Sequence, residues 1–221
     1  MNWQRARTSE KKNERKEAIC KAAVTLFKKH GYEGVSFNGI ASEAGFTKSN
    51  MYRYFSSREE IFLNIFSGLF EKWVEDYLRR LEKLEQGEDV NLFANAWVNS
   101  FTSNLQFLEL TPFLFVSLER NSSYEQLFMF KTLAKKLLYE VSLEVGRIFP
   151  DLRGEKAFIF LNLSYAATSS YWAASCQNDA LRKIYQQDEF KELKPDFEND
   201  LITAIKVIIL GIQEDLATNE E

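Results

Sequence analysis

The chain has 221 residues but only one histidine, two cysteines and three prolines. His30 follows two lysines and precedes Gly31, so we expect it in the last turn of a helix, where it complements the helix dipole and binds no metal. Cys20 and Cys176 are far apart and show no CxxC spacing. We therefore expect two thiols in a reducing cytoplasm, without a disulfide or a metal site.

Signatures of catalysis are also missing. The sequence has no Gly-rich phosphate loop and no nucleophile elbow, which are patterns that common enzyme classes require. We therefore expect a protein that is not an enzyme and that uses no cofactor.

Long apolar runs are scarce. Residues 1–16 are polar and charged and do not resemble a secretory signal. Residues 157–176 form an uncharged run of about the length of a bilayer span, but asparagine, serine and threonine interrupt it and its flanks lack a basic bias. We expect a helix buried between protein surfaces, no membrane segment, and a cytoplasmic location.

Charge is unevenly distributed along the chain. Residues 1–60 contain twelve Lys and Arg against seven Asp and Glu, a net charge of +5, whereas residues 61–221 carry −9. A basic head on an acidic body is typical of a protein that holds a polyanion at one end. A merely solvated surface is the alternative reading of the charges alone.

Helical periodicity runs through the whole chain and no strand pattern appears, so the expected fold class is all-α. The first helix is expected over residues 10–30 and the second over 37–44, with Ser36 as its N-cap and Gly39 costing about 1 kcal/mol relative to Ala. Gly45 supplies a turn, and Thr47 caps a third, short helix that ends near Phe55.

The second and third helices form a helix-turn-helix. Met51 and Phe55 form an inward stripe with Ile40 and Ala44. Amides, hydroxyls and guanidinium groups read base edges, whereas helix amino termini, lysine and tyrosine hydroxyls bind phosphate. The outward side chains are of these kinds and predict binding of duplex DNA; they are Lys48, Ser49, Asn50, Tyr52 and Arg53.

The stretch AVTLFKKHGYEGVSFNGIASEAGFTKSNMYRYFSSREEIF resembles the DNA-binding head of TetR-type transcriptional regulators. The resemblance is carried by Phe27, Gly31, Tyr32, Ile40, Ala41, Ala44, Gly45, Tyr52, Tyr54, Phe55 and Glu60. It implies a homodimer of all-helical subunits, each with a DNA-binding head and a body that releases DNA when a small molecule binds.

The resemblance also implies roles for single residues. The residues that match phosphate-contacting positions of the family are Ser36, Tyr52, Tyr54 and Arg58. The residues that match base-facing positions are Asn38, Lys48, Ser49, Asn50 and Arg53. Thr47, at the start of the third helix, joins this DNA-binding set. Three features depart from the family pattern: Ser49 and Asn50 replace Gly and a small residue, Met51 replaces Leu or Ile, and Gly39 replaces a side chain and is expected to loosen the second helix. In addition, Arg58 stands where Lys is more usual, which should still serve a phosphate.

The expected domains are a DNA-binding domain over residues 1–57 and an effector-binding and dimerisation domain over 58–221. In the second domain we expect helices over 58–84, 90–108, 121–149, 155–176 and 196–216, with short helices after Pro112 and within 178–193. More than half the circumference of the last helix is apolar. Together with the 155–176 helix it predicts a two-fold, four-helix interface; a monomeric core is the alternative.

An aromatic excess of nineteen Phe, nine Tyr and four Trp favours a ligand cavity. The candidate residues are Trp97, Phe101, Asn104, Phe115, Glu119, Phe128 and Tyr165. Ordinary core packing is the alternative for the aromatics, and a surface ion pair for Glu119. The expected function is a ligand-responsive repressor that binds a palindromic, double-stranded DNA operator as a dimer and is released by an aromatic or lipophilic effector. An architectural DNA-binding protein without an effector is the alternative.

Overall fold

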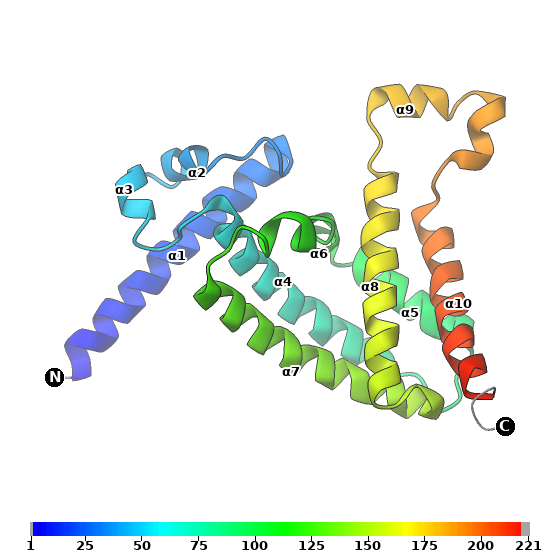
Figure 1. The fold of residues 1–221 in the computed structure, drawn as a ribbon. Coiled ribbons are helices and arrows are strands. Elements are labelled where there is room, and N and C mark those ends of the chain that lie inside the picture. Colours follow the sequence, from blue (N-terminus) through cyan, green and yellow to red (C-terminus); the bar gives the residue numbers. More distant parts are fainter. Residues whose placement is uncertain (1, 218–221) are drawn as a thin grey trace. The chain divides into compact units, whose positions relative to one another are not determined.

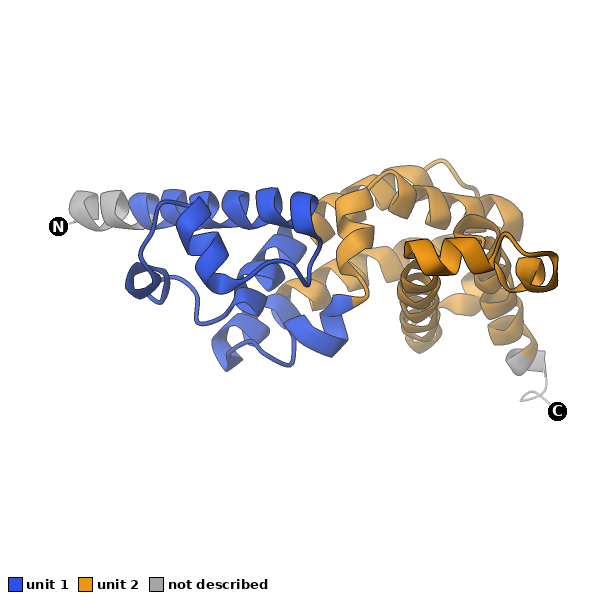
Figure 2. Ribbon diagram, turned by 90° about the horizontal axis from the view of Figure 1, so that it is seen from above, with its two compact units in different colours: residues 1–68, 113–132 blue, residues 69–112, 133–221 orange. Residues whose placement is uncertain are grey.

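The computed structural model describes the backbone of residues 2–217 and the side chains of residues 10–214. These residues form helices and connecting turns, without a strand in the described part (Figure 1). They divide into two compact units (Figure 2). Unit 1 contains the chain up to Gly68 together with Phe113–Thr132, and unit 2 contains Leu69–Pro112 and the chain from Leu133 onward. The division therefore differs from the single boundary expected after residue 57, because an internal segment joins the amino-terminal head.

Unit 1 is built from helices at the start and in the middle of the chain. It contains α1 (Asn2–His30), α2 (Phe37–Glu43), α3 (Lys48–Met51), the first part of α4 (Arg58–Leu81), the π-helix η1 (Leu114–Leu118) and the start of α7 (Tyr124–Ile148). The helix α1 begins eight residues earlier than expected, because residues 2–30 contain no Gly or Pro to stop it. The core of the unit includes Ile19, Ala23, Ile40, Met51, Phe55, Phe62 and Phe66.

Unit 2 contains the remaining helices. They are the second parts of α4 and α7, with α5 (Val90–Thr102), α6 (Leu105–Leu110), η2 (Pro150–Leu152), α8 (Glu155–Ser175), α9 (Asp179–Ile184), η3 (Asp188–Leu193) and α10 (Phe197–Ala217). In Figure 1, α8 and α10 lie side by side, and the two helices pack against each other. No helix within residues 2–217 combines the length and the apolarity that crossing a membrane requires.

One expected helix is interrupted. Residues 90–108 were predicted as a single helix, but α5 ends at Thr102 and α6 starts at Leu105. The cause is Asn104, which has a non-helical backbone and whose side-chain amide donates to the Ser100 carbonyl at 2.9 Å. A side chain that bonds a free carbonyl at a helix end offers the backbone an alternative to further helix.

Candidate nucleic-acid interface

The first turn of α2 is held by a hydroxyl cap, as the sequence predicts. The Ser36 hydroxyl accepts a hydrogen bond from the Gly39 amide at 3.0 Å. A Cβ on Gly39 would lie 3.1 Å from that hydroxyl oxygen, which is tighter than ordinary contact. The missing side chain therefore leaves room for the cap, a reason for glycine at this position that periodicity does not reveal. Asn38, beside it, is exposed.

The turn between α2 and α3 has the expected chemistry. Gly45 has a φ of 70°, in the left-handed region that favours glycine. Thr47 is the N-cap of α3, and its hydroxyl accepts from the Asn50 amide at 3.3 Å. Regular α-helix ends at Met51, but the amide of Phe55 still donates to the Met51 carbonyl at 3.1 Å, so helical turns continue to that residue.

The faces of α3 separate as expected. Met51 and Phe55 are buried against the head together with Ile40, whereas Ala44 is half-buried. The exposed residues on the opposite side are Lys48, Ser49, Asn50, Tyr52 and Arg53. This arrangement gives the helix a continuous polar surface that is free to enter a groove.

A hollow of about 470 Å³ lies between the start of α2, α3 and the residues before α4. Its lining includes Ser36, Asn38, Lys48 and Tyr52. The rings of Phe37 and Tyr52 lie 5.2 Å apart, which positions the tyrosine at its edge. With Arg58, which also lines the hollow, the structure brings five of the predicted DNA contacts to one concave surface.

Arg58 has several partners within the head. Its guanidinium donates to the Val35 carbonyl at 2.8 Å and to the Tyr32 carbonyl at 3.3 Å, and it forms an ion pair with Glu59 at 3.0 Å. It also lies 4.5 Å from the centroid of the Tyr32 ring, and its side chain is only 20% exposed. The phosphate contact predicted for Arg58 stays a prediction, and these protein partners favour a structural role. In that role Arg58 would hold the loop that ends in the Ser36 cap.

Glu60 joins the same head to the internal segment. Its side chain is buried, and its carboxylate accepts from the Ser56 amide at 2.6 Å and from the Ser123 amide at 3.0 Å. Burial acts to raise the pKa of the Glu60 carboxyl, but the hydrogen bonds from Ser123 and Ser56 outweigh it and the pKa is lowered. The Ser57 hydroxyl adds a bond to the Asn121 carbonyl at 2.9 Å.

Tyr32 makes a second connection to this segment. Its ring stacks on Phe113 with centroids 4.1 Å apart, and its hydroxyl lies 2.9 Å from the Ser117 hydroxyl in the π-helix η1. Burial raises the pKa of the Tyr32 phenol, although the bond to Ser117 opposes that shift. These contacts explain why Phe113–Thr132 belongs to unit 1. Sequence reasoning missed the connection, because the residues are about 85 positions apart and follow no common pattern.

The predicted ligand residues do not gather in one unit. Trp97, Phe101, Asn104 and Tyr165 belong to unit 2, whereas Phe115, Glu119 and Phe128 belong to unit 1. Trp97 and Phe101 are at most 1% exposed and pack in a cluster of rings, with Trp73 4.7 Å from Phe101. In this structure the two aromatics therefore pack as core, the alternative reading, and their role as a ligand wall stays a prediction.

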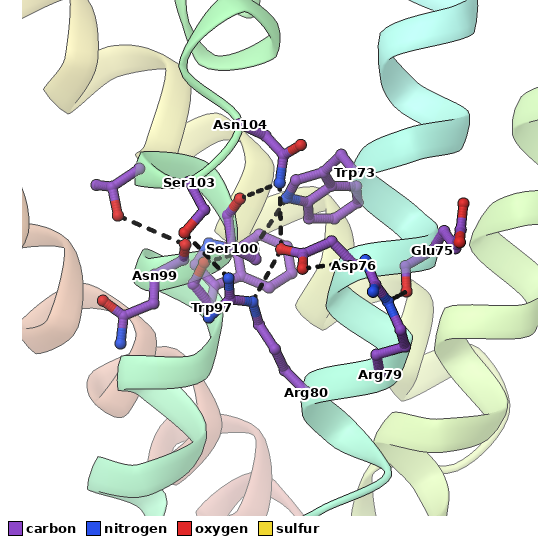
Figure 3. A network of polar contacts seen from close by, with 11 residues as sticks. Trp73, Glu75, Asp76, Arg79, Arg80, Trp97, Asn99, Ser100, Ser103 and Asn104 are labelled. Atoms are coloured by element: carbon purple, nitrogen blue, oxygen red, sulfur yellow. Dashed lines mark hydrogen bonds and ion pairs between the residues drawn. The ribbon is translucent and has the colours of Figure 1, made fainter.

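The polar members of the set in unit 2 have protein partners. The Asn104 amide donates to Asp76 at 3.2 Å, and Asp76 pairs with Arg80 at 2.9 Å (Figure 3). The Trp97 indole donates to the Thr168 hydroxyl at 3.0 Å. The Tyr165 hydroxyl donates to the Thr111 carbonyl at 3.1 Å.

The three members in unit 1 differ in exposure. Phe115 is 54% and Phe128 61% exposed. Glu119 forms an ion pair with Lys131 at 2.6 Å, but its side chain is only 19% exposed. A ligand role for these three residues stays a prediction.

Comparisons with known proteins identify two consecutive family matches along the chain. Residues 19–65 match the family model described as "Bacterial regulatory proteins, tetR family", and residues 67–215 match "Tetracyclin repressor-like, C-terminal domain". The solved structure of the fatty acid degradation regulator FadR from Bacillus halodurans aligns with a TM-score of 0.51 at 16% identity, covering 88% of this chain and 94% of that one. At this identity the likeness concerns the fold alone.

Two curated relatives match over shorter stretches. The uncharacterized HTH-type transcriptional regulator YfiR from Bacillus subtilis (strain 168) is 32% identical over 99 residues, 45% of this chain and 46% of YfiR. The biofilm operon icaADBC negative regulator IcaR from Staphylococcus epidermidis is 28% identical over 64 residues, 29% of this chain and 35% of IcaR. The alignment therefore spans less than half of each relative. The two family models, one of which covers well over half of the sequence, show that this chain belongs to the TetR family of transcriptional regulators, which are DNA-binding proteins and not enzymes.

Proposed function

We propose that this protein is a repressor that binds an inverted-repeat operator as a homodimer and leaves the operator when a small molecule binds. The observation that carries the proposal is the exposed face of α3, where Lys48, Ser49 and Asn50 lie opposite the buried Met51. Their amide, hydroxyl and ammonium groups are suited to base edges and phosphates. The name of IcaR, a negative regulator, supports repression as the direction. A regulator of this kind works on cytoplasmic DNA.

A dimer is supported by the outer surface of α8 and α10. Phe158, Ile159 and Leu163 on α8 are 37–47% exposed, and Val207 and Leu210 on α10 are 63% and 49% exposed. The two helices pack together, so these side chains form one apolar face, and α8 carries no charge after Lys156. We propose that a second copy covers this face and holds two α3 helices at a fixed separation.

We place the effector site in unit 2, beside two buried hydroxyls. Tyr77 and Ser164 are 0% exposed, and among the described residues their hydroxyl oxygens have no hydrogen-bond partner. An unpaired buried hydroxyl costs about 1–3 kcal/mol. Burial raises the pKa of the Tyr77 phenol well above its ordinary value, so the group remains a neutral donor.

Tyr77 belongs to a ring cluster, and Ser164 lies one helical turn before Thr168, which accepts from a ring of that cluster. Trp97 lies 5.3 Å from the Tyr77 ring and donates to Thr168, whose hydroxyl donates to the Ser164 carbonyl at 2.7 Å. An aromatic or lipophilic effector with polar substituents would pair these hydroxyls while its frame packs among the rings. We propose such a compound as the effector class.

The test begins with DNA. Genomic fragments retained by the protein are sequenced, and the shared site is footprinted; we expect an inverted repeat with half-sites about one helical turn, roughly 34–36 Å, apart. Retention of DNA without a common sequence would contradict the operator proposal and favour the architectural alternative.

Aromatic and lipophilic compounds are then screened against the protein–operator complex. A releasing compound should lose most of its effect on the Tyr77→Phe variant and keep its effect on the Tyr139→Phe variant. Tyr139→Phe is the control, because it also removes a tyrosine hydroxyl from unit 2 but at a position that is 55% exposed. An equal loss in both variants would remove Tyr77 from the proposed site.

A further inference from the structure

A second basic surface on the head combines two predicted DNA contacts with three cations that have no predicted role. It is a hollow of about 270 Å³ lined by Lys11, Lys12, Arg15, Arg53 and Tyr54. We call these five residues the cationic hollow. Three come from α1, in a turn near the start of the helix predicted from the sequence, and two directly follow α3. Neither periodicity nor the family resemblance assigned a role to the three residues of α1.

Helix geometry explains how α1 contributes. Lys11 and Arg15 are four residues apart and therefore lie on one face, and Lys12 lies beside Lys11. The Arg15 guanidinium is 5.8 Å from the centroid of the Phe46 ring, and that ring is 6.2 Å from the ring of Tyr54. This chain of contacts directs the arginine of α1 toward the residues that follow α3.

The charges of the cationic hollow are not neutralised. Its lining holds four cations and no carboxylate. Within the described residues, neither the three cations of α1 nor Arg53 forms an ion pair. By contrast, Arg58, Arg80 and Arg147 all pair with a carboxylate. Four like charges around one hollow repel one another, so an anion in the hollow would stabilise it.

We propose that the cationic hollow binds phosphates of the DNA backbone next to the bases that α3 reads. All four cations are exposed, and a duplex presents several phosphates in a row to them. Arg53 is only two residues beyond Met51, the last residue of α3, so the contacts continue from the reading helix. This inference rests on the proposed DNA binding, and it assigns Arg53 to phosphate in place of the base edge suggested by the family resemblance.

The test compares two double variants with the same charge change. Lys11→Gln with Arg15→Gln removes two cations from the hollow, whereas Lys28→Gln with Lys29→Gln removes two exposed cations from the last turn of the same helix. Each phosphate contact contributes about 0.9 to the slope of log K against log salt. We expect the first variant to lower the slope by about 1.8 per head, on operator and on random duplex alike, and the second to leave it unchanged. Equal slopes in both variants would overturn the inference.

A modified duplex locates the contact. Uncharged methylphosphonate groups placed on the backbone beside each half-site should weaken binding of the wild type several-fold and have little further effect on Lys11→Gln with Arg15→Gln. If both proteins lose the same factor, the hollow does not bind those phosphates and the inference is wrong. Melting curves of both variants verify that the head remains folded.

A free anion is the competing ligand. Inorganic phosphate is titrated against the wild type; saturable binding in the hollow, together with an unchanged DNA slope in the Lys11→Gln and Arg15→Gln variant, would overturn the inference in favour of a small-anion site. Because the slope is also measured on random duplex, it tests the hollow even if no operator is found. The operator proposal and this inference can therefore fail separately.

Discussion

Unit 1 and unit 2 are both helical and rich in aromatic rings, but among the described residues the polar groups that they bury differ. Unit 1 uses buried or half-buried charge: Glu60 accepts two backbone amides, and Arg58 donates to two backbone carbonyls. Unit 2 uses neutral pairs in its core, where the indoles of Trp73 and Trp97 donate to the hydroxyls of Ser100 and Thr168.

The difference has a functional meaning. Charge-assisted hydrogen bonds are stronger and more directional than neutral ones, so they hold the loops around α2 and α3 in one geometry. The neutral, ring-lined interior of unit 2 is suited to an uncharged or lipophilic molecule. Five predictions test this contrast.

The largest effect is expected at the apolar face of unit 2. Val207→Glu would bury a carboxylate at the proposed dimer interface, and a buried unpaired charge costs several kcal/mol. We expect sedimentation to show a monomer and operator affinity to fall at least about 100-fold, because the two heads no longer bind as a linked pair. Leu193→Glu, an equally exposed apolar position on η3, is the control and should stay dimeric. A dimeric Val207→Glu would place the interface elsewhere.

The next effect concerns the carbonyls bound by Arg58 in unit 1. Arg58→Ala removes bonds to Val35 and Tyr32, and hydrogen bonds to a charged group contribute about 1.5–3 kcal/mol each. We expect a clear drop in melting temperature and an unchanged slope of log K against log salt, measured below the melting point. A slope lowered by about 0.9 would instead show that Arg58 contacts a DNA phosphate.

Glu60→Gln tests the charge of the buried carboxylate. The folded pKa of Glu60 is below its ordinary value of 4.5, so its ionised form stabilises the fold above about pH 4.5, and this stabilisation is lost as the pH falls through the folded pKa. We expect the variant to be less stable by about 1–3 kcal/mol at pH 7, and the difference to shrink below pH 4.5. Denaturation of the wild type and the variant at pH 7 and at a pH below 4.5 measures the difference in stability. A difference that does not change with pH would exclude the charge of Glu60 as its source.

A smaller effect is expected at a single base contact. Asn50→Ala should cost about 1–3 kcal/mol on the operator, roughly 5- to 150-fold in affinity, and little on random DNA. The Asn50 amide group is exposed, while its backbone amide makes the Thr47 cap, which alanine preserves. Equal weakening on both DNAs would mean that Asn50 reads no base.

The smallest effect compares two helical glycines of unit 1. A Cβ on Gly68 would meet nothing within 4 Å, so Gly68→Ala should stabilise the protein by about 0.5–1 kcal/mol. Gly39→Ala should gain less or lose stability, because its Cβ would crowd the Ser36 hydroxyl at 3.1 Å. Equal gains in thermal melting would show that the cap adapts freely.

Much of the head was predictable because its signals are local. Ser36 and Thr47 cap helices that begin at the next residue, and Gly45 supplies the left-handed turn. The outward and inward faces of α3 follow from four-residue spacing. The break at Asn104 was not predicted, because a side chain that bonds back to a carbonyl leaves no periodic signal.

The candidate site was predictable only in part. The residues predicted on the outer face of α3 are exposed, as expected. Arg58 is a residue type that often binds phosphate, but here its guanidinium contacts a backbone carbonyl and a carboxylate. Likewise, Trp97 and Phe101 have the composition of a cavity wall and are core. Composition states which interactions a side chain can make, whereas its neighbours decide which it does make.

The sequence by itself determined the helical class, the helix-turn-helix and the basic character of the head, because propensity, capping and charge depend on residues close together in the chain. Only the tertiary structure decided that Phe113–Thr132 belongs with the head, that Glu60 accepts the Ser123 amide, and that Lys11 and Arg53 share one hollow. The residues in these contacts are far apart in the sequence, from 42 positions for Lys11 and Arg53 to 85 positions for Tyr32 and Ser117. Such pairings arise from packing of whole helices, and no local pattern encodes them.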